Sequence, residues 1–232
     1  MLSKSAFSLH LGLFAIILLT ATLLPVHATS VLVQQSNGGC FGCSSTLSVS
    51  LANNVVSGDV IVVGIVVGGA SFGLSSLTDS LGSSFTQAVR STSAVPPIVY
   101  IYWATLSKGG VEIITATFSA AAPAESLYIY EVSGVTTTGV ATATGSGTGT
   151  SISTSSSVLF QPGAFLLGIV GTDSLGGAAV AGAGFILSRG NAGTDGTYAE
   201  YSTSGVSSPT SFAATANSAV SWAEDGIVLM PN

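Results

Sequence analysis

The feature that most limits what this chain can fold into is the lack of a helical repeat of apolar residues after Ser30. Apolar residues do not recur at i, i+3 and i+4 over any long window, and Gly, Ser and Thr interrupt the sequence every few residues. Short runs rich in Val, Ile, Thr, Tyr and Phe recur instead. The pattern predicts an all-β protein, an antiparallel β-sandwich of jelly-roll or immunoglobulin-like type. The predicted strands cover residues 30–35, 46–51, 60–67, 85–91, 98–106, 112–119, 126–133, 140–143, 151–153, 164–170, 184–187, 198–203, 210–216 and 222–229.

The chain also repeats parts of itself. Residues 58–66, with the sequence GDVIVVGIV, are echoed by GAFLLGIV at residues 163–170. The pentapeptide TDSLG occurs at residues 78–82 and returns letter for letter at 172–176. Self-similarity of this kind predicts a duplicated half-sandwich. Chance similarity in a chain rich in Gly, Ser and Thr is the alternative.

The two predicted halves cover about residues 47–135 and 146–229. Residues 136–157 join them and contain fourteen Ser or Thr among 22 residues. Such a segment fits a flexible linker between two small domains. Its alternating Thr-x-Thr-x pattern also fits exposed strands, and we favour one interleaved sandwich at residues 46–232.

The first 28 residues have the pattern of a secretory signal peptide. Lys4 supplies a positive start, residues 11–24 form an apolar run, and Val26-His27-Ala28 offers a small-x-small cleavage site. A retained membrane anchor and a pilin-type signal are the alternatives. Cleavage after residue 28 predicts a secreted protein, extracellular or on the cell surface, with no membrane contact of its own. Residues 29–45 then form an N-terminal strand and a disulfide loop.

Charge is sparse and one-sided in the rest of the chain. Only 6% of residues are charged, and after residue 28 three cations, Arg90, Lys108 and Arg189, stand against ten carboxylates. No basic patch is present, which argues against nucleic acid and anionic membranes as partners. With so few titratable groups, we expect stability to be nearly independent of pH.

Cys40 and Cys43 are the only cysteines, spaced C-x-x-C in a Gly-rich stretch. A zinc site needs about four ligands, and both histidines fall in the predicted signal peptide, so no metal or other cofactor is expected. A redox motif would need a βαβ context, which the strand pattern does not offer. A local disulfide is therefore the prediction, with pairing between subunits as the alternative.

Few residues suggest catalysis, and we predict that the protein is not an enzyme. A Ser-His-Asp triad is excluded after signal cleavage because no histidine remains. Glu131 and Glu200 lie inside predicted strands, where a carboxylate pair could serve a glycosidase. Asp79 and Asp173 belong to the repeated TDSLG turns and are predicted to cap them, with a calcium site as the weaker alternative.

Four tyrosines form a candidate platform for binding sugars. Tyr100 and Tyr102 share one face of their predicted strand, and Tyr128 and Tyr130 share one face of theirs. On neighbouring strands the four rings could stack against a glycan. Packing inside the sheet is the competing interpretation, and the one we favour.

The N-terminal strand is the segment with the clearest functional signal. It comprises Ser30, Val31, Leu32, Val33, Gln34 and Gln35. After cleavage this uncharged, β-prone strand would precede a Gly-Gly hinge at residues 38–39. It either pairs with its own sheet or completes the sheet of a neighbouring copy by donor-strand addition. The absence of Lys and Pro from the strand favours pairing, because edges that stay unpaired usually carry them.

Two segments, SGDVIV at residues 57–62 and YEVSG at 130–134, resemble a β-sandwich module of bacterial and archaeal surface proteins. The layout of the whole chain resembles secreted prokaryotic filament subunits, especially the archaeal thread-like fibres joined by donor strands. This resemblance implies a structural subunit of a pilus- or thread-like extracellular filament whose partners are copies of itself. The alternative is a secreted carbohydrate-binding or adhesive module that contacts surface glycans.

Overall fold

The computed structural model of the chain describes residues 29–42, 44–69, 71–91, 97–121, 124–173, 179–189 and 196–232. The predicted signal peptide lies outside these ranges, as does Cys43. Within them the protein is all-β, with antiparallel strand pairing throughout, which confirms the predicted fold class. No helix in the described part of the chain is long and apolar enough to cross a membrane.

The described residues form fourteen strands. They are β1 (Val31–Phe41), β2 (Thr46–Ser50), β3 (Val60–Gly68), β4 (Leu74–Asp79), β5 (Thr86–Arg90), β6 (Ile98–Thr105), β7 (Ile113–Phe118), β8 (Ala124–Ser133), β9 (Val135–Ser153), β10 (Phe165–Thr172), β11 (Ala179–Ala181), β12 (Ile186–Arg189), β13 (Tyr198–Ser202) and β14 (Ala213–Pro231). The sequence pattern missed β4, because a register shift between Leu74 and Ser76 breaks its alternation of apolar and polar residues.

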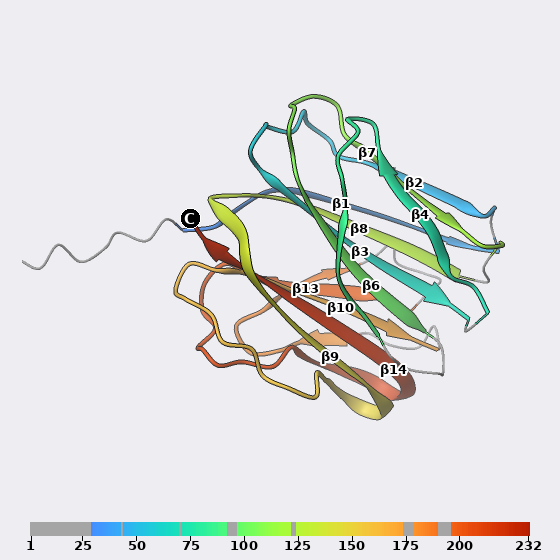
Figure 1. The fold of residues 1–232 in the computed structure, drawn as a ribbon. Coiled ribbons are helices and arrows are strands. Elements are labelled where there is room, and N and C mark those ends of the chain that lie inside the picture. Colours follow the sequence, from blue (N-terminus) through green and yellow to red (C-terminus); the bar gives the residue numbers. More distant parts are fainter. Residues whose placement is uncertain are drawn as a thin grey trace, which may run out of the picture.

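The first eight strands form one sandwich of two sheets. Its main sheet has the order β1-β8-β3-β6-β5, and its small sheet the order β2-β7-β4. Apolar side chains from alternate positions of β3, such as Ile61, Val63 and Ile65, meet Ile114 and Phe118 of β7 between the two sheets. Figure 1 places β2, β4 and β7 together as the outer layer on this side.

The remaining six strands form a second sandwich from one bent sheet. Its main part has the order β9-β14-β10-β13-β12. The long strands β9 and β14 then turn over it, so that residues 151–153 and 213–215 pair with each other, and residues 214–216 pair with β11. Ile152 and Ala214 of the folded-over part pack on Val170 and Tyr198 of the main part.

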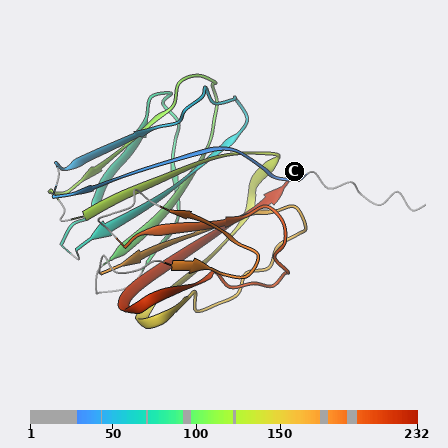
Figure 2. The same cartoon turned by 180° about the vertical axis from the view of Figure 1, so that it is seen from behind.

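The two sandwiches are stacked through their main sheets, as Figures 1 and 2 show from opposite sides. Val60 and Val62 of β3 and Ile101 of β6 pack there against Phe165 and Leu167 of β10. Strands β3 and β10 are thus covered on both faces, which explains why they are almost continuous apolar runs. No strand of one half pairs with a strand of the other among the described residues, so our expectation of one interleaved sandwich was wrong.

The strand order of the first half recurs in the second. The main-sheet order β1-β8-β3-β6-β5 matches β9-β14-β10-β13-β12. In the small sheet, the end of β9 corresponds to β2, the start of β14 corresponds to β7, and β11 corresponds to β4. A tyrosine lies opposite the central strand in both halves, where Ile65 pairs with Tyr100 and Val170 pairs with Tyr198. The repeated GIV is one residue out of step in this match, because Val66 pairs with Val99. The repeated TDSLG is not part of this match, because Asp79 ends β4 whereas Thr172 ends β10.

Complementary sizes fix the contact between the two main sheets. A Cβ added to Gly64 would lie 2.4 Å from the Cδ1 atom of Ile169, and one added to Gly171 would lie 2.6 Å from the Cγ1 atom of Val66. Each glycine therefore accepts a branched side chain from the opposite sheet. Two interlocking contacts of this kind set the relative position of the sandwiches.

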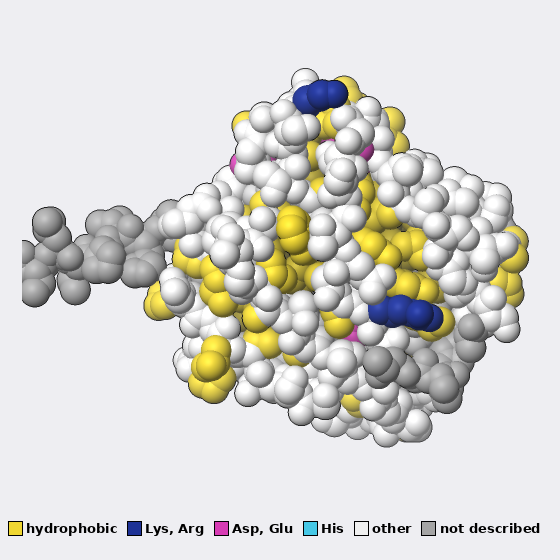
Figure 3. All heavy atoms as spheres, in the orientation of Figure 1, with side chains coloured by type: hydrophobic (Ala, Val, Ile, Leu, Met, Phe, Trp, Pro, Cys, Tyr) yellow, Lys and Arg dark blue, Asp and Glu magenta, His cyan; other side chains and the backbone are white. Residues whose placement is uncertain are grey.

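Most of the few acidic side chains lie inside the protein. Six carboxyl groups are buried, against ten Asp and Glu in the whole sequence, and the face in Figure 3 displays very little acidic surface. The buried ones are Glu112, Glu125, Glu131, Glu200, Glu224 and Asp225. Burial disfavours the charged form of a carboxyl group. We therefore replace the expectation of nearly pH-independent stability by a predicted pH dependence, because the few titratable groups sit where ionisation costs most.

Candidate subunit interface

The N-terminal strand β1 forms one edge of the first main sheet. It pairs antiparallel with β8, from Val31 opposite Ser133 to Phe41 opposite Ala124. Because β1 is the end strand of that sheet, β8 is its one neighbour in the sheet order. The predicted pairing strand, residues 30–35, thus supplies the start of β1 and docks on the chain's own β8 in this structure.

A β-bulge at Val33 sets which way the side chains of β1 point. Leu32 pairs with Val132 and Gln34 pairs with Glu131, so Val33 is an extra residue on this strand. Leu32 packs against the apolar layer between the two main sheets. Val33 is 47% exposed.

The side-chain amide of Gln34 is fully engaged by hydrogen bonds. Its Nε2 atom donates to the carbonyl oxygen of Asn53 at 3.0 Å and to Oε2 of Glu131 at 2.7 Å. Its Oε1 atom accepts from the backbone N–H of Asn53 at 3.0 Å. Both N–H groups and the carbonyl oxygen of the amide are therefore used, which ties β1 to β8 and to the loop before β3.

Glu131 is the buried acceptor in this contact. Its side chain is 0% exposed, and its Oε1 atom accepts the backbone N–H of Val56 at 2.9 Å. The carboxyl of Asp59, which immediately precedes β3, shares a hydrogen bond with Glu131. Because both oxygens of Glu131 accept N–H groups, we assign the proton of this carboxyl pair to Asp59. Burial first, then the charge and hydrogen bond of Glu131, raise the pKa of Asp59 to about 6.

A second acidic pair, Glu112 and Asp79, lies near the first. Glu112 is 0% exposed. Burial, followed by the charges of Asp79 and Glu131, raises the pKa of Glu112 to about 7. Among the described residues, no group of three or more His, Cys, Asp and Glu is arranged to hold a metal ion. The raised pKa favours the neutral, protonated form of Glu112 in the folded protein.

No family model, curated protein or solved structure matches this chain. The role of the β1 edge therefore has to be inferred from its own geometry. That geometry offers a strand that can pair, a bulge that orients it, and a buried carboxylate that binds one of its side chains.

The four tyrosines do not form the predicted platform. Strand β3 lies between β6 and β8, so the two pairs of rings are not on neighbouring strands. Tyr100 and Tyr102 face the core of the first sandwich, whereas Tyr128 and Tyr130 face the layer between the two main sheets. Only Tyr102 is partly exposed, and its hydroxyl donates to Gln87. The rings pack the interior, which is the interpretation favoured from the sequence, and they do not form a glycan-stacking face.

The candidate acid pair Glu131 and Glu200 is also separated. Glu131 belongs to the first sandwich, while Glu200 lies on β13 of the second. Glu200 is 0% exposed and accepts the backbone N–H groups of Gly182 and Ala213 at 2.8 and 3.0 Å. The two carboxyl groups therefore face no common cleft.

The two TDSLG aspartates have different roles. Asp79 caps its own turn, because its Oδ1 atom accepts the backbone N–H of Ser83 at 2.8 Å, as predicted. Asp173 instead accepts the backbone N–H of Ser221 at 2.9 Å and so ties the end of β10 to β14. The sequence match between the two turns thus hides two different contacts.

The predicted Cys40–Cys43 disulfide involves a residue outside the described ranges. Cys40 lies near the end of β1, opposite Glu125 of β8, and Cys43 follows in the loop to β2. A disulfide in this loop stays a prediction. If formed, it would shorten the connection through which β1 joins the rest of the fold.

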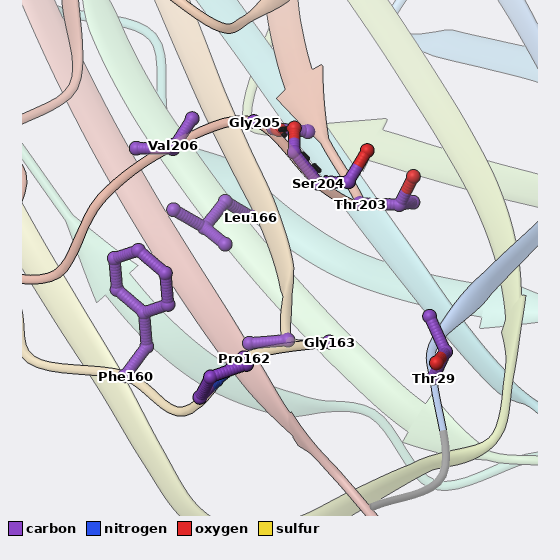
Figure 4. A pocket seen from close by; sticks show the side chains of 11 residues that line it. Thr29, Phe160, Pro162, Gly163, Leu166, Thr203, Ser204, Gly205 and Val206 are labelled. Atoms are coloured by element: carbon purple, nitrogen blue, oxygen red, sulfur yellow. Dashed lines mark hydrogen bonds between the residues drawn. The ribbon is translucent and has the colours of Figure 1, made fainter.

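A cavity of about 330 Å³ lies beside the start of β1. Figure 4 shows Phe160, Leu166 and Val206 on one side of it and Thr29 across from them. None of its lining residues is charged; the polar ones are Thr29, Ser202, Thr203 and Ser204. Ser30 donates its backbone N–H to the carbonyl of Gly163 at 2.9 Å, which holds the strand entry against this wall.

The sequence pointed to β1 but not to the residues that receive it. Glu131 stood out as a charge within an apolar strand, and it is buried with partners. Gln34 was named only as part of the strand, and Asn53 carried no signal, since an uncharged amide in a polar stretch looks like solvent-exposed surface.

Proposed function

We propose that the protein is a structural subunit of an extracellular filament in which β1 of one subunit pairs with β8 of the next. In that arrangement residues 30–35 leave their own sheet and occupy the same edge on a neighbouring copy. The observation that carries the proposal is the position of β1, an uncharged N-terminal strand at a sheet edge. Pairing of this head-to-tail kind does not close on itself and therefore builds a filament.

The two halves of the fold explain why β1 is the exchangeable strand. The strand that corresponds to β1 in the second half is the first part of β9, which follows β8 directly through Gly134. It is therefore fixed at both ends. Within the described fold, the backbone connects β1 to the other strands only through the residues after Phe41. Strand β1 can therefore leave β8 without separating any other pair of strands.

Two surface features support association of copies. Val31 and Val33 are 53% and 47% exposed on an edge strand that carries no charge. Natural edge strands are usually protected by Lys, Pro or a cover. Secretion to the outside belongs to the same proposal and rests on the signal-peptide pattern of residues 1–28. We propose no second function, because the tyrosines that motivated a glycan-binding module are interior residues.

Cross-linking between subunits tests the proposal directly. Val31 and Ser133 are opposite each other in the β1–β8 pair, and directly opposed residues are close enough for a disulfide. A mixture of Val31→Cys and Ser133→Cys proteins should form disulfide-linked dimers and longer species. Neither single variant alone should do so to the same extent, and wild-type protein oxidised in parallel reports any background from Cys40 and Cys43.

The double variant Val31→Cys/Ser133→Cys is the matched control. Oxidised before assembly, it should hold β1 on its own β8 and stay monomeric, while its reduced form should assemble into filaments visible by negative-stain microscopy. Filaments from the oxidised double variant, together with no cross-link in the mixture, would rule the strand-addition proposal out.

A further inference from the structure

We infer that Glu131 and the backbone of Asn53 form a recognition site for a carboxamide side chain, which selects the strand that docks on β8 and fixes its register. The ligand class is a primary amide presented by an extended, uncharged strand. In this structure the ligand is Gln34 of the chain itself. That the docked strand belongs to a neighbouring subunit in a filament rests on the proposed function.

The hydrogen-bond chemistry of the site matches an amide and not its nearest relatives. Asn53 presents one acceptor and one donor, and Glu131 presents a carboxylate acceptor. A primary amide satisfies all three, because it has two N–H donors and a carbonyl acceptor. An ionised carboxylate in place of the Gln34 amide has no donor and would place its charge against Glu131. A thioether there would leave the buried Oε2 atom of Glu131 without the donor it has now.

Glu131 is held in the site by a contact other than Gln34. Glu131 is 0% exposed, and its other oxygen is held by the backbone N–H of Val56. The groups that face it are carboxyls: Asp59 before β3, and Glu112 from the segment before β7, which also feels the charge of Asp79. Lys108 lies on the neighbouring turn and is exposed. In the docked state the strand itself supplies the amide N–H that the Oε2 atom of Glu131 accepts.

The bulge gives the site its register. Gln34 stands opposite Glu131 only because Val33 is inserted between it and Leu32, which stays opposite Val132. A slip by one residue would place Gln35 or Val33 at the site and turn Leu32 out of the apolar layer. Recognition of the amide and burial of Leu32 thus select the same alignment.

Two Gln→Glu substitutions on adjacent residues test the inference. Gln34 and Gln35 lie on the same strand, but Gln35 is exposed and makes no hydrogen bond through its side chain in this structure. Hydrogen exchange of the β1 backbone amides is measured by mass spectrometry on the full-length, monomeric protein at pH 7. Gln34→Glu should raise the opening of residues 31–41 at least about tenfold over Gln35→Glu, since it removes both N–H donors that Asn53 and the buried Glu131 accept.

The pH dependence separates recognition from a general loss of packing. At pH 4 the carboxyl group introduced by Gln34→Glu is largely protonated and regains one O–H donor, so this variant should recover much of its protection. Gln34→Met, which cannot regain a donor, should gain at pH 4 only the protection that Gln35→Met also gains. Should Gln34→Glu fail to fold, the comparison of Gln34→Met with Gln35→Met serves in its place, with the same tenfold difference expected.

Equal exchange in the Gln34 and Gln35 variants would overturn the inference, whatever the protein assembles into. The proposed function fails by a different observation, the absence of cross-links between Val31→Cys and Ser133→Cys subunits. A protein that shows the exchange difference but no cross-links has the amide site and uses it within one chain.

Discussion

At the scale of single residues, the protein buries carboxyl groups, whose charged form is costly to remove from water. Glu224 is 0% exposed, and neither of its oxygens has a hydrogen-bond partner. Burial first, then the charges of Glu200 and Asp225, raise the pKa of Glu224 well above its ordinary value. Such a group is tolerated when protonated and costly when ionised. Elsewhere the interior is apolar and closely fitted, as at Gly64 and Ile169.

Replacing Glu224 by Gln should raise stability at high pH and change it little at low pH. The pKa of Glu224 is higher in the folded protein than in the unfolded chain. The wild type therefore keeps its full stability in acid and loses part of it as the pH rises through the folded-state pKa of Glu224. Gln does not ionise and avoids this loss. At pH 8 we expect a Tm at least about 3 °C above that of the wild type, the shift that ~1 kcal/mol produces in a chain of this size.

Calorimetry at pH 4 and pH 8 measures that effect, and Asp173→Asn is the matched control because Asp173 is exposed. A Glu224→Gln protein that is less stable than the wild type at pH 8 would contradict the assignment of Glu224 as a neutral acid in the folded state.

Gly64→Ala should destabilise the protein through the contact between the two main sheets. The added Cβ would lie 2.4 Å from Ile169, so one of the stacked sheets must move. Overpacking of this kind costs about 1–3 kcal/mol. Chemical denaturation measures the loss, and Gly73→Ala is the control, since its added Cβ would meet only the Tyr100 hydroxyl at 3.9 Å.

A second substitution identifies the cause of that loss. Ile169→Ala in the Gly64→Ala background should recover part of the stability, giving a coupling between the two positions. Additive effects would mean that the two residues do not meet as the structure places them.

At the scale of elements, β1 differs from the other thirteen strands in being both N-terminal in the fold and at a sheet edge. Its contacts are Leu32 in the apolar layer, Gln34 in the amide site and the β8 ladder. Beneath it, the pKa of Asp59 is raised to about 6 from an ordinary 3.8. When β1 lifts away, water reaches this pair and the pKa should return toward the ordinary value. Docking of β1 and protonation of Asp59 are therefore linked.

Docking of β1 should weaken as the pH rises. Below about pH 4 Asp59 is protonated whether or not β1 is docked, so docking is strongest there. Between about pH 4 and 6 the docked form holds the extra proton, and its advantage falls with rising pH. Hydrogen exchange of residues 31–41, corrected for the intrinsic rate, should accelerate over this window in the wild type.

Asp59→Asn should flatten that dependence, because an amide does not titrate, whereas Asp173→Asn should leave it unchanged. A pH profile of β1 exchange that is the same in Asp59→Asn and in the wild type would show that other groups govern the strand.

At the scale of the whole molecule, two stacked sandwiches share an interior that contains several neutral acids. Burial is the first cause that raises the pKa of Glu112, Glu200 and Asp225, each to about 7. In the unfolded chain these groups titrate near about 4. The folded protein therefore binds more protons than the unfolded chain between about pH 4 and 7.

The stability of the whole protein should accordingly be greatest in acid. The sign follows from the raised pKa values: the contribution of these groups is complete below about pH 4 and disappears as the pH rises through about 7. Thermal unfolding monitored by circular dichroism from pH 3 to pH 8 should give a Tm that falls across this range. A maximum of the Tm near neutral pH would contradict the prediction.

The class of fold and most strand positions could be predicted from local pattern, because alternating apolar residues and turn-forming Gly, Ser and Asp act locally. The sequence also indicated the N-terminal strand, since the absence of charge is visible without a structure. It did not determine that the halves stack rather than interleave, because apolar strands such as β3 are equally suited to either arrangement.

The amide site on β8, by contrast, could be found only in the folded structure. The bulge at Val33 and the contact of Gln34 with Glu131 join residues 97 positions apart in the chain. The burial of six carboxyl groups is likewise a property of the folded chain alone. These properties depend on which residues are neighbours on adjacent strands. Those neighbours are set by long-range packing and not by the local sequence pattern.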